Sequence, residues 1–101
     1  MGRVLAEVEA QGEAARTVVC VTSDHGDMLG DHGDSGKSKP WQGSASVPLV
    51  CAGPGIASGR VVTAPVATLD VAATFMELGG ATPAPGMTAV SYTHLTLPTK
   101  A

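Results

Sequence analysis

Two short apolar runs predict the strands of this chain. Residues 17–22 and 47–52 consist almost entirely of apolar or β-branched side chains. Runs of this length and composition are typical of strands that are covered on both faces, as in a parallel sheet. A weaker run at 60–66, which ends near Pro65, predicts a third, short strand. In open α/β sheets, ligands bind at the carboxyl ends of such strands, so the residues that follow each run are the first candidates for chemistry.

Helical periodicity appears in two other segments. Residues 3–11 have apolar side chains on one face and glutamates on the other, and Gly12 suits the position after the last helical residue. A second helix is expected from about Leu69 to Leu78, with Thr68 as its N-cap and Asp70 in its first turn. We expect its apolar face to consist of Leu69, Ala72, Phe75 and Met76.

Composition and charge narrow the class of protein. The chain has 101 residues, of which 44% are hydrophobic and 15% are charged, enough for one small domain. Its net charge is −3 and its six basic residues are scattered, which argues against a nucleic-acid partner. No apolar stretch approaches the roughly 18 residues of a membrane span. The N-terminus leads into an amphipathic helix, not an export signal, and the compartment stays unknown.

The two cysteines each lie near the end of an apolar run. We expect Cys20 and Cys51 to be small buried hydrophobic residues. A disulfide between them is possible if their strands are neighbours. Two cysteines alone do not indicate the disulfide framework of a small secreted domain. Their spacing matches no zinc-binding pattern.

The long segment between the two strong strands carries the candidate chemistry. Residues 23–46 are rich in Gly, Asp and Ser, and loops of this length are usually functional or disordered. Within it the tetrad Asp-His-Gly-Asp occurs twice, at 24–27 and 31–34. Such a group of acids and histidines suits a metal ion, although the spacing fits neither an EF-hand nor a zinc-protease helix. A solvated acidic turn explains the composition equally well.

Position favours the first tetrad as a metal site. Asp24 and His25 follow the strand directly, and Gly26 allows the backbone to turn so that both side chains can converge on one cation. A carboxylate and an imidazole suit Mn²⁺ or Zn²⁺. Mg²⁺ and Ca²⁺ prefer oxygen ligands, but a single histidine ligand does not exclude them. At least two further ligands must come from elsewhere. Lys37, thirteen positions after Asp24, is a surface cation or, beside a metal, a contact for a bound oxyanion.

Three stretches, taken in order, resemble a known family. They read TSDHGDMLGDHG, then GKSKPWQGSASVPLVCAGPGI, then GRVVTAPVATLDVAATFMELGG. This series resembles the later part of the sulfatase family, which belongs to the alkaline phosphatase superfamily, and the resemblance covers about residues 2–87. It implies an α/β fold class, with this chain a fragment of an alkaline phosphatase-like doubly wound sheet with flanking helices.

The resemblance also implies roles for individual residues. Asp24 and His25 match the second pair of metal ligands, and Lys37 matches the lysine that contacts the sulfate group. The implied metal is a divalent cation, usually Ca²⁺ and in some members Mn²⁺. In the family, a cysteine or serine in a C-x-[PA]-S-R motif becomes formylglycine, whose hydrate attacks the sulfur. The implied substrate is a sulfate ester of a small molecule or a glycan.

Departures from the family pattern indicate an incomplete enzyme. Neither cysteine fits the formylglycine motif, and the first pair of metal aspartates is absent. Asp34-Ser35 replace an apolar residue and an aromatic, Gln42 replaces a common Glu, and Ser46 a common Arg. No catalytic role is assigned to His32, which is expected to order the loop or face solvent. We expect residues 1–101 to be inactive alone, as part of an enzyme that hydrolyses sulfate monoesters.

Two other functions remain open from the sequence. A phosphate or phosphonate ester hydrolase of the same superfamily would share the same three site residues, and a non-catalytic metal-binding fragment would use the duplicated tetrad. We expect residues 1–87 to form a partial catalytic domain and 88–101 to be an unrelated or disordered tail, one that resembles translated sequencing-adapter read-through. Because only two helices can cover the strands, the isolated chain is expected to aggregate or form a loose globule.

Overall fold

The computed structural model describes residues 1–89 and 91, which belong to two compact units, Met1–Gly53 and Pro54–Ala101. Most of the tail expected at 88–101 therefore lies outside the described residues. The first unit contains, in chain order, α1 (Gly2–Ala10), the 3-10 turn η1 (Ala14–Arg16), β1 (Val19–Thr22), the 3-10 turn η2 (Asp31–Gly33), α2 (Gln42–Ala45) and β2 (Leu49–Ala52). The second unit contains α3 (Asp70–Leu78).

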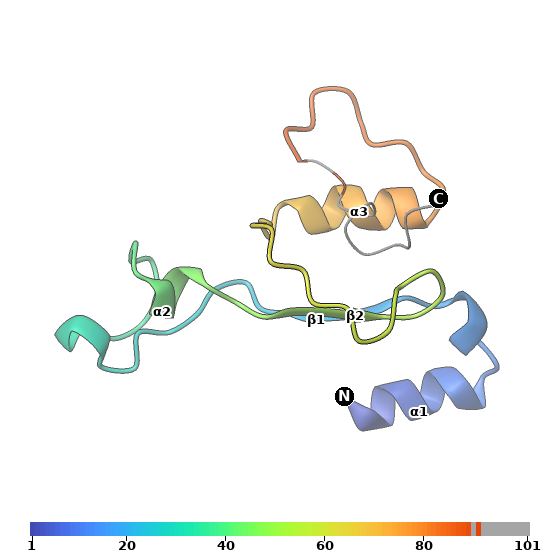
Figure 1. The fold of residues 1–101 in the computed structure, drawn as a ribbon, viewed down its shortest axis with the longest axis horizontal. Coiled ribbons are helices and arrows are strands. Elements are labelled where there is room, and N and C mark those ends of the chain that lie inside the picture. The colour runs from blue at the N-terminus through green and yellow to red at the C-terminus, as the bar shows by residue number, and fades with distance from the viewer. Residues whose placement is uncertain (90, 92–101) are drawn as a thin grey trace. The chain divides into compact units, whose positions relative to one another are not determined.

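Strands β1 and β2 form a two-stranded ribbon from which the long loop extends at one end (Figure 1). Both predicted strands are confirmed, but they pair with each other in the antiparallel direction, not as members of a parallel sheet. Thr22 pairs with Leu49 and Val19 with Ala52. The reason is topological: the loop leaves β1 and returns at the same end, so β2 runs back beside β1 and needs no crossover connection.

The expectation that both faces of the strands are covered is wrong for this chain. Val21 and Val50, which face each other across the ribbon, are 40% and 64% exposed. The other residues of β1 and β2 are exposed or half-buried, so the ribbon is not shielded from water on both faces. The fully buried apolar side chains of the described segments are Met28, in the long loop, and Ala73, in α3.

The two cysteines are not independent buried residues, which corrects the sequence-based expectation. Cys20 and Cys51 lie directly opposite each other in the ribbon, with 4.1 Å between their Cα atoms, and form a disulfide. Both are half-exposed. The antiparallel register explains the pairing, because it brings together two residues that lie 31 positions apart in sequence. The disulfide therefore closes the stem of the loop that carries Asp24, His25 and Lys37.

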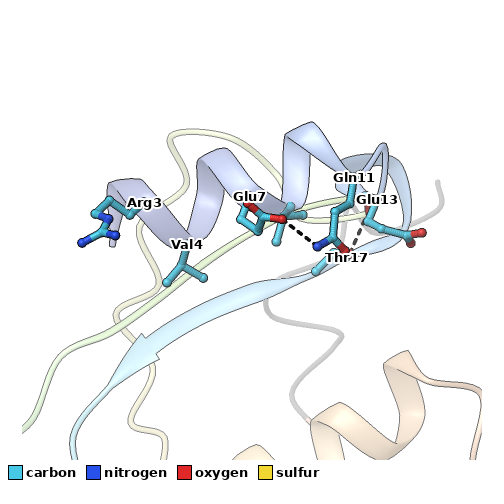
Figure 2. A pocket seen from close by; sticks show the side chains of 7 residues that line it. Arg3, Val4, Glu7, Gln11, Glu13 and Thr17 are labelled. Carbon is cyan, nitrogen blue, oxygen red and sulfur yellow. Dashed lines mark hydrogen bonds between the residues drawn. The ribbon is translucent and has the colours of Figure 1, made fainter.

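The first helix is confirmed, although each of its ends lies one residue earlier than predicted and its C-cap is Gln11. Helix α1 covers Gly2–Ala10, and Gly12 follows its C-terminus with a φ of +72°, a conformation that favours glycine. Figure 2 shows a groove between α1 and the approach to β1, where the Gln11 amide donates to Glu7 and the Thr17 hydroxyl donates to the carbonyl of Glu13. None of the predicted site residues lines this groove, whose walls are Arg3, Val4, Glu7, Val8, Gln11, Glu13 and Thr17.

The second unit confirms the predicted helix but not its cap or its buried face. Helix α3 covers Asp70–Leu78 with Asp70 in its first turn, but the N-cap is Leu69 instead of Thr68. Its buried residues are Ala73 and Thr74. The Thr74 hydroxyl donates to the carbonyl of Asp70 at 2.8 Å, which lets a polar side chain be buried within the helix.

Two further expectations for the second unit are wrong. On the predicted apolar face, Leu69 and Phe75 are 55% and 45% exposed. No strand forms at 60–66. Val61 is 85% exposed, and Pro65 cannot donate to a ladder, so this segment lacks the partner that a strand needs. Within residues 1–89 and 91, every helix falls short of the length and apolar character needed to cross a bilayer.

Candidate functional site

The first tetrad lies where the sequence predicts it, directly after an extended strand. Strand β1 ends at Thr22, and Asp24 and His25 follow at the end of the ribbon that carries the long loop. The Asp24 side chain is 81% exposed and the His25 side chain 38%. The carboxylate is therefore free to meet a ligand from solvent, while the imidazole is held partly by the protein.

Side chains of the first tetrad converge. Asp24 Oδ2 lies 3.4 Å from His25 Nε2, and Asp24 Oδ1 accepts a hydrogen bond from the His25 backbone N–H at 3.0 Å. The Ser23 hydroxyl lies 2.8 Å from the His25 carbonyl oxygen, to which it donates, and 3.4 Å from Asp24 Oδ1. The turn after the strand is thus fixed by contacts among three consecutive residues.

The orientation of the His25 ring determines which nitrogen can bind a cation. Nδ1 lies 2.8 Å from the carbonyl oxygen of Gly26, which can only accept a hydrogen bond. Nδ1 must therefore carry a hydrogen, and in the neutral ring Nε2 then presents its lone pair. That lone pair lies next to a carboxylate oxygen, so two acceptors face each other. A metal cation between them would remove the repulsion.

Hydrogen bonding also tunes the carboxylate. The pKa of Asp24 is lowered, first by the hydrogen bond from the His25 backbone N–H and then by the charge of the imidazolium when His25 is protonated. A lowered pKa keeps the carboxylate ionised at neutral pH, which is the form that ligates cations.

Gly26 permits a close approach of α2 to the first tetrad. A Cβ built on Gly26 would lie 2.0 Å from the carbonyl oxygen of Gly43, so no larger residue fits without a backbone shift. The Gly26 N–H donates to the carbonyl of Ser44 at 2.8 Å. Glycine is thus required here for contact with the one-turn helix α2, which adds a packing reason to the turn expected from the sequence.

Lys37 lies on an exposed segment of the same loop. Its neighbours Gly36 and Ser38 both have left-handed φ values, +77° and +65°. Within the described residues, the Lys37 side chain makes no hydrogen bond or ion pair, and nothing joins it directly to Asp24 or His25. The structure therefore brings together two of the three predicted site residues, and the role of Lys37 stays a prediction.

The backbone beside Lys37 is held on both sides. Before it, Met28 N–H donates to the Gly36 carbonyl at 3.0 Å, and Gly36 N–H donates to Asp27 Oδ1 at 3.3 Å. After it, Lys39 N–H donates to Ser44 Oγ at 3.1 Å. The buried Met28 and the nearly buried Ser44, which are 1% and 4% exposed, anchor these contacts.

Residues of the second tetrad occupy other positions. The His32 ring stacks on Trp41, with ring centroids 4.3 Å apart and planes inclined by 20°. His32 itself is exposed and has a φ of +54°. The expected solvent exposure of His32 is confirmed, and a role in ordering the loop stays a prediction, which the ring contact with Trp41 suits. In the described part of the chain, no three His, Cys, Asp or Glu side chains group to hold a metal by themselves.

Sequence reasoning missed the residues that support the site. Ser23 binds within the first tetrad, and Ser44 binds the segment that carries Lys37, residues 36–39, called the lysine segment below. A serine in a glycine-rich loop has no distinctive sequence pattern that would single it out. The one-turn helix α2 lies inside the segment predicted to be a loop, because four residues containing Gly and Ser show no helical periodicity. Of these residues, only Ser23 could have been predicted as a site residue, because it directly follows an apolar strand.

Comparisons with known proteins agree with the motifs. The family model described as Sulfatase matches residues 1–81. Arylsulfatase K of Danio rerio is 40% identical over 80 residues, an alignment that covers 79% of this chain and 15% of that protein. The match thus spans only 15% of the length of this curated relative.

Two solved structures resemble the chain over nearly its whole length. BT4656, solved in complex with its substrate D-glucosamine-2-N,6-O-disulfate, superposes with a TM-score of 0.88 at 29% identity, covering 95% of this chain and 20% of that one. The phosphonate monoester hydrolase SpPMH from Silicibacter pomeroyi superposes with a TM-score of 0.85 at 32% identity, covering 99% and 20%. The two-stranded ribbon, the loop and the helices of this chain thus correspond to one part of the larger α/β fold of these proteins.

Proposed function

Because the chain belongs to the sulfatase family, we propose that it carries half of a divalent-cation site and the oxyanion-contacting lysine of a sulfate-monoester hydrolase. Asp24 and His25 would hold the cation, and Lys37 would contact the sulfate oxygens. The single observation that carries the proposal is the 3.4 Å separation of Asp24 Oδ2 and His25 Nε2, in a ring whose Nδ1 lies 2.8 Å from the Gly26 carbonyl oxygen.

The donor set fits a divalent cation. One ionised carboxylate oxygen and one imidazole lone pair lie at the spacing of neighbouring ligands of a single ion. The family resemblance favours Ca²⁺, and the imidazole makes Mn²⁺ the alternative. A bound cation would draw negative charge from the sulfate oxygens. The remaining ligands and the formylglycine nucleophile would lie outside this chain.

The residues of this chain would have distinct tasks. Asp24 supplies negative charge, and the Gly26 carbonyl orients the His25 ring so that Nε2 faces the same point. Lys37 is an exposed ammonium on an anchored backbone segment, which suits a point charge placed against a substrate oxyanion. We propose a sulfated small molecule or glycan as the substrate, since BT4656 acts on a disulfated glucosamine.

One alternative has a specific observation in its favour. The similarity to the phosphonate monoester hydrolase, at 32% identity, supports a phosphonate or phosphate ester as the substrate instead. Both reactions need a cation and a lysine against a tetrahedral anion, so the residues of this chain do not discriminate between them. The nucleophile encoded by the full gene, together with the activity of the full-length enzyme on a panel of sulfate, phosphate and phosphonate esters, would discriminate between the two reactions.

The experiment that tests the proposal is a Mn²⁺ titration of the oxidised chain, followed by electron paramagnetic resonance, with Ca²⁺ as a competitor. We expect weak binding, because only two protein ligands are present, and a loss of affinity of about tenfold or more in Asp24→Asn and in His25→Ala. Asp31→Asn is the matched control, since it changes the same residue type at the same place in the second tetrad.

Three outcomes are informative. Equal affinity in Asp24→Asn and Asp31→Asn would contradict the proposed site. Tight, stoichiometric Ca²⁺ binding by the chain would instead favour the self-contained metal-binding fragment. The chain alone is expected to release no product from an aryl sulfate, and metal-dependent turnover would show that it already contains a complete site.

A further inference from the structure

Ser44 is a nearly buried polar residue, 4% exposed, that contacts both parts of the proposed site. Its carbonyl oxygen accepts a hydrogen bond from the Gly26 N–H at 2.8 Å, next to His25. Its hydroxyl oxygen accepts one from the Lys39 N–H at 3.1 Å, two residues after Lys37. Ser44 therefore joins the backbone next to Asp24 and His25, called the metal pair below because they are the proposed cation ligands, to the backbone of the lysine segment.

The local sequence makes this double contact possible. Ser44 lies in the single turn of α2, where the last carbonyl groups have no partner within the helix and are available to the loop. Gly26 has no Cβ, so α2 can approach closely enough for its N–H to reach one of those carbonyls. The hydroxyl on the same residue is then left to bind the neighbouring segment.

The lysine segment needs such an anchor at its far end. Gly36 is held through Asp27 and Met28, but the chain then passes through the left-handed Ser38 before it reaches Lys39. Lys39 also forms an ion pair with Asp34 at 2.9 Å, but both of these side chains are well exposed, and such pairs contribute little to stability. The bond to Ser44 is the contact of Lys39 that reaches a buried residue.

We propose that Ser44 is a positioning residue that sets the placement of Lys37 relative to Asp24 and His25. This inference rests on the proposed function for the roles of those three residues. The carbonyl bond to Gly26 does not depend on the side chain of residue 44, whereas the bond to Lys39 does. Removing the hydroxyl therefore releases the lysine segment and leaves the metal pair in place.

The first test measures amide hydrogen exchange and does not depend on the proposed function. In Ser44→Ala, the Lys39 amide should exchange about fivefold faster, as expected for one lost hydrogen bond, while the Gly26 amide keeps its rate. Alanine is the best helix former, so α2 should persist. Ser46→Ala is the matched control, because it removes a serine hydroxyl close to the end of the same helix. An unchanged Lys39 rate would overturn the proposal.

The second test measures coupling between cation and anion. Sulfate that contacts both Lys37 and a bound Mn²⁺ must tighten Mn²⁺ binding, because coupling between two ligands is reciprocal. We expect Ser44→Ala to keep the Mn²⁺ affinity measured without sulfate and to lose the tightening, as Lys37→Met does. Ser44→Thr, which retains a hydroxyl, should restore it.

The outcomes separate this inference from the proposed function. Absence of Mn²⁺ binding by the unmodified chain would contradict the proposed function, while the exchange experiment would still decide whether Ser44 holds the lysine segment. Mn²⁺ binding without any effect of sulfate would overturn the role of Lys37 and, with it, this inference. Normal sulfate coupling in Ser44→Ala would overturn the positioning role alone.

Discussion

In the first DHGD tetrad, residues 24–27, the carboxylate and the imidazole face each other, whereas in the second, residues 31–34, the imidazole stacks on an aromatic ring. Asp24 Oδ2 and His25 Nε2 are 3.4 Å apart. Within the described residues, no ion pair joins the acid and the histidine of the second tetrad, and the ring of that histidine lies against Trp41. Identical residues in identical order thus produce two different arrangements.

The last acid of each tetrad differs in the same way. Asp27 Oδ1 accepts hydrogen bonds from the backbone N–H groups of Leu29 and Gly36, so it organises the loop from within. Asp34 instead pairs with the Lys39 ammonium and accepts from the Ser35 N–H. The side chain of Asp27 thus joins two backbone segments of the loop, whereas the side chain of Asp34 binds a lysine and its own neighbour.

The difference comes from what each tetrad follows. The first begins two residues after an extended strand whose partner is fixed by pairing and by a disulfide. The second follows Leu29 and Gly30, both with left-handed φ, and forms a 3-10 turn. A motif in a loop acquires a geometry from its flanking backbone, so repetition of a motif does not imply repetition of its function.

The largest predicted contrast concerns the glycines at the third position. Gly26→Ala should lower the free energy of unfolding by about 3 kcal/mol, because the new methyl group meets the backbone of α2. Gly33→Ala should cost about 1 kcal/mol, since space is open around it and only its φ of +69° is unfavourable for alanine. Denaturant unfolding of the oxidised chain measures both. Equal losses would mean that α2 does not pack against the first tetrad.

A smaller contrast concerns the histidines. His32→Ala should expose Trp41 to water and shift its fluorescence to longer wavelength, because the ring that stacks on it is removed. His25→Ala should leave the emission unchanged. Trp41 is the only tryptophan in the chain, so the signal reports on this contact without ambiguity. A shift in His25→Ala of the same size would indicate that the two tetrads are not structurally independent.

The smallest effect is a pH dependence of stability that comes from Asp34, the last acid of the second tetrad. The Lys39 ammonium, followed by the Ser35 N–H, lowers the pKa of Asp34. The folded pKa therefore lies below the unfolded one, and the contribution of this ion pair is present at neutral pH and lost as the pH falls through the lowered pKa. Because the pair is well exposed, Asp34→Asn should remove only a slight acid dependence of stability, which unfolding measured at acidic and neutral pH would detect.

The sequence was sufficient to predict the elements that have strong local signals. Both apolar runs form strands, both amphipathic segments form helices, and the acid and histidine after the first strand converge. These features depend on side chains that are close in sequence. The buried face of α3 was predicted incorrectly, because burial depends on which other parts of the protein pack against the helix.

Features that depend on distant residues could not be predicted. The antiparallel pairing of β1 with β2, and hence the disulfide between Cys20 and Cys51, depends on how a loop of Gly, Asp and Ser returns the chain. The contact of Gly26 with α2 depends on the same return. The disulfide adds a covalent constraint that the apolar pattern does not contain, and the expectation that the isolated chain aggregates or forms a loose globule stays a prediction.

Covalent closure of the loop has a consequence for a chain that has been cut. Any single cleavage between Cys20 and Cys51 leaves two pieces that are still joined through sulfur, with the strand stems held in register. A nick in the exposed stretch around Leu29 would therefore not separate Asp24 from Lys37 until a reductant reached the bridge. In thiol-rich surroundings, the same nick would release the two halves of the loop from each other.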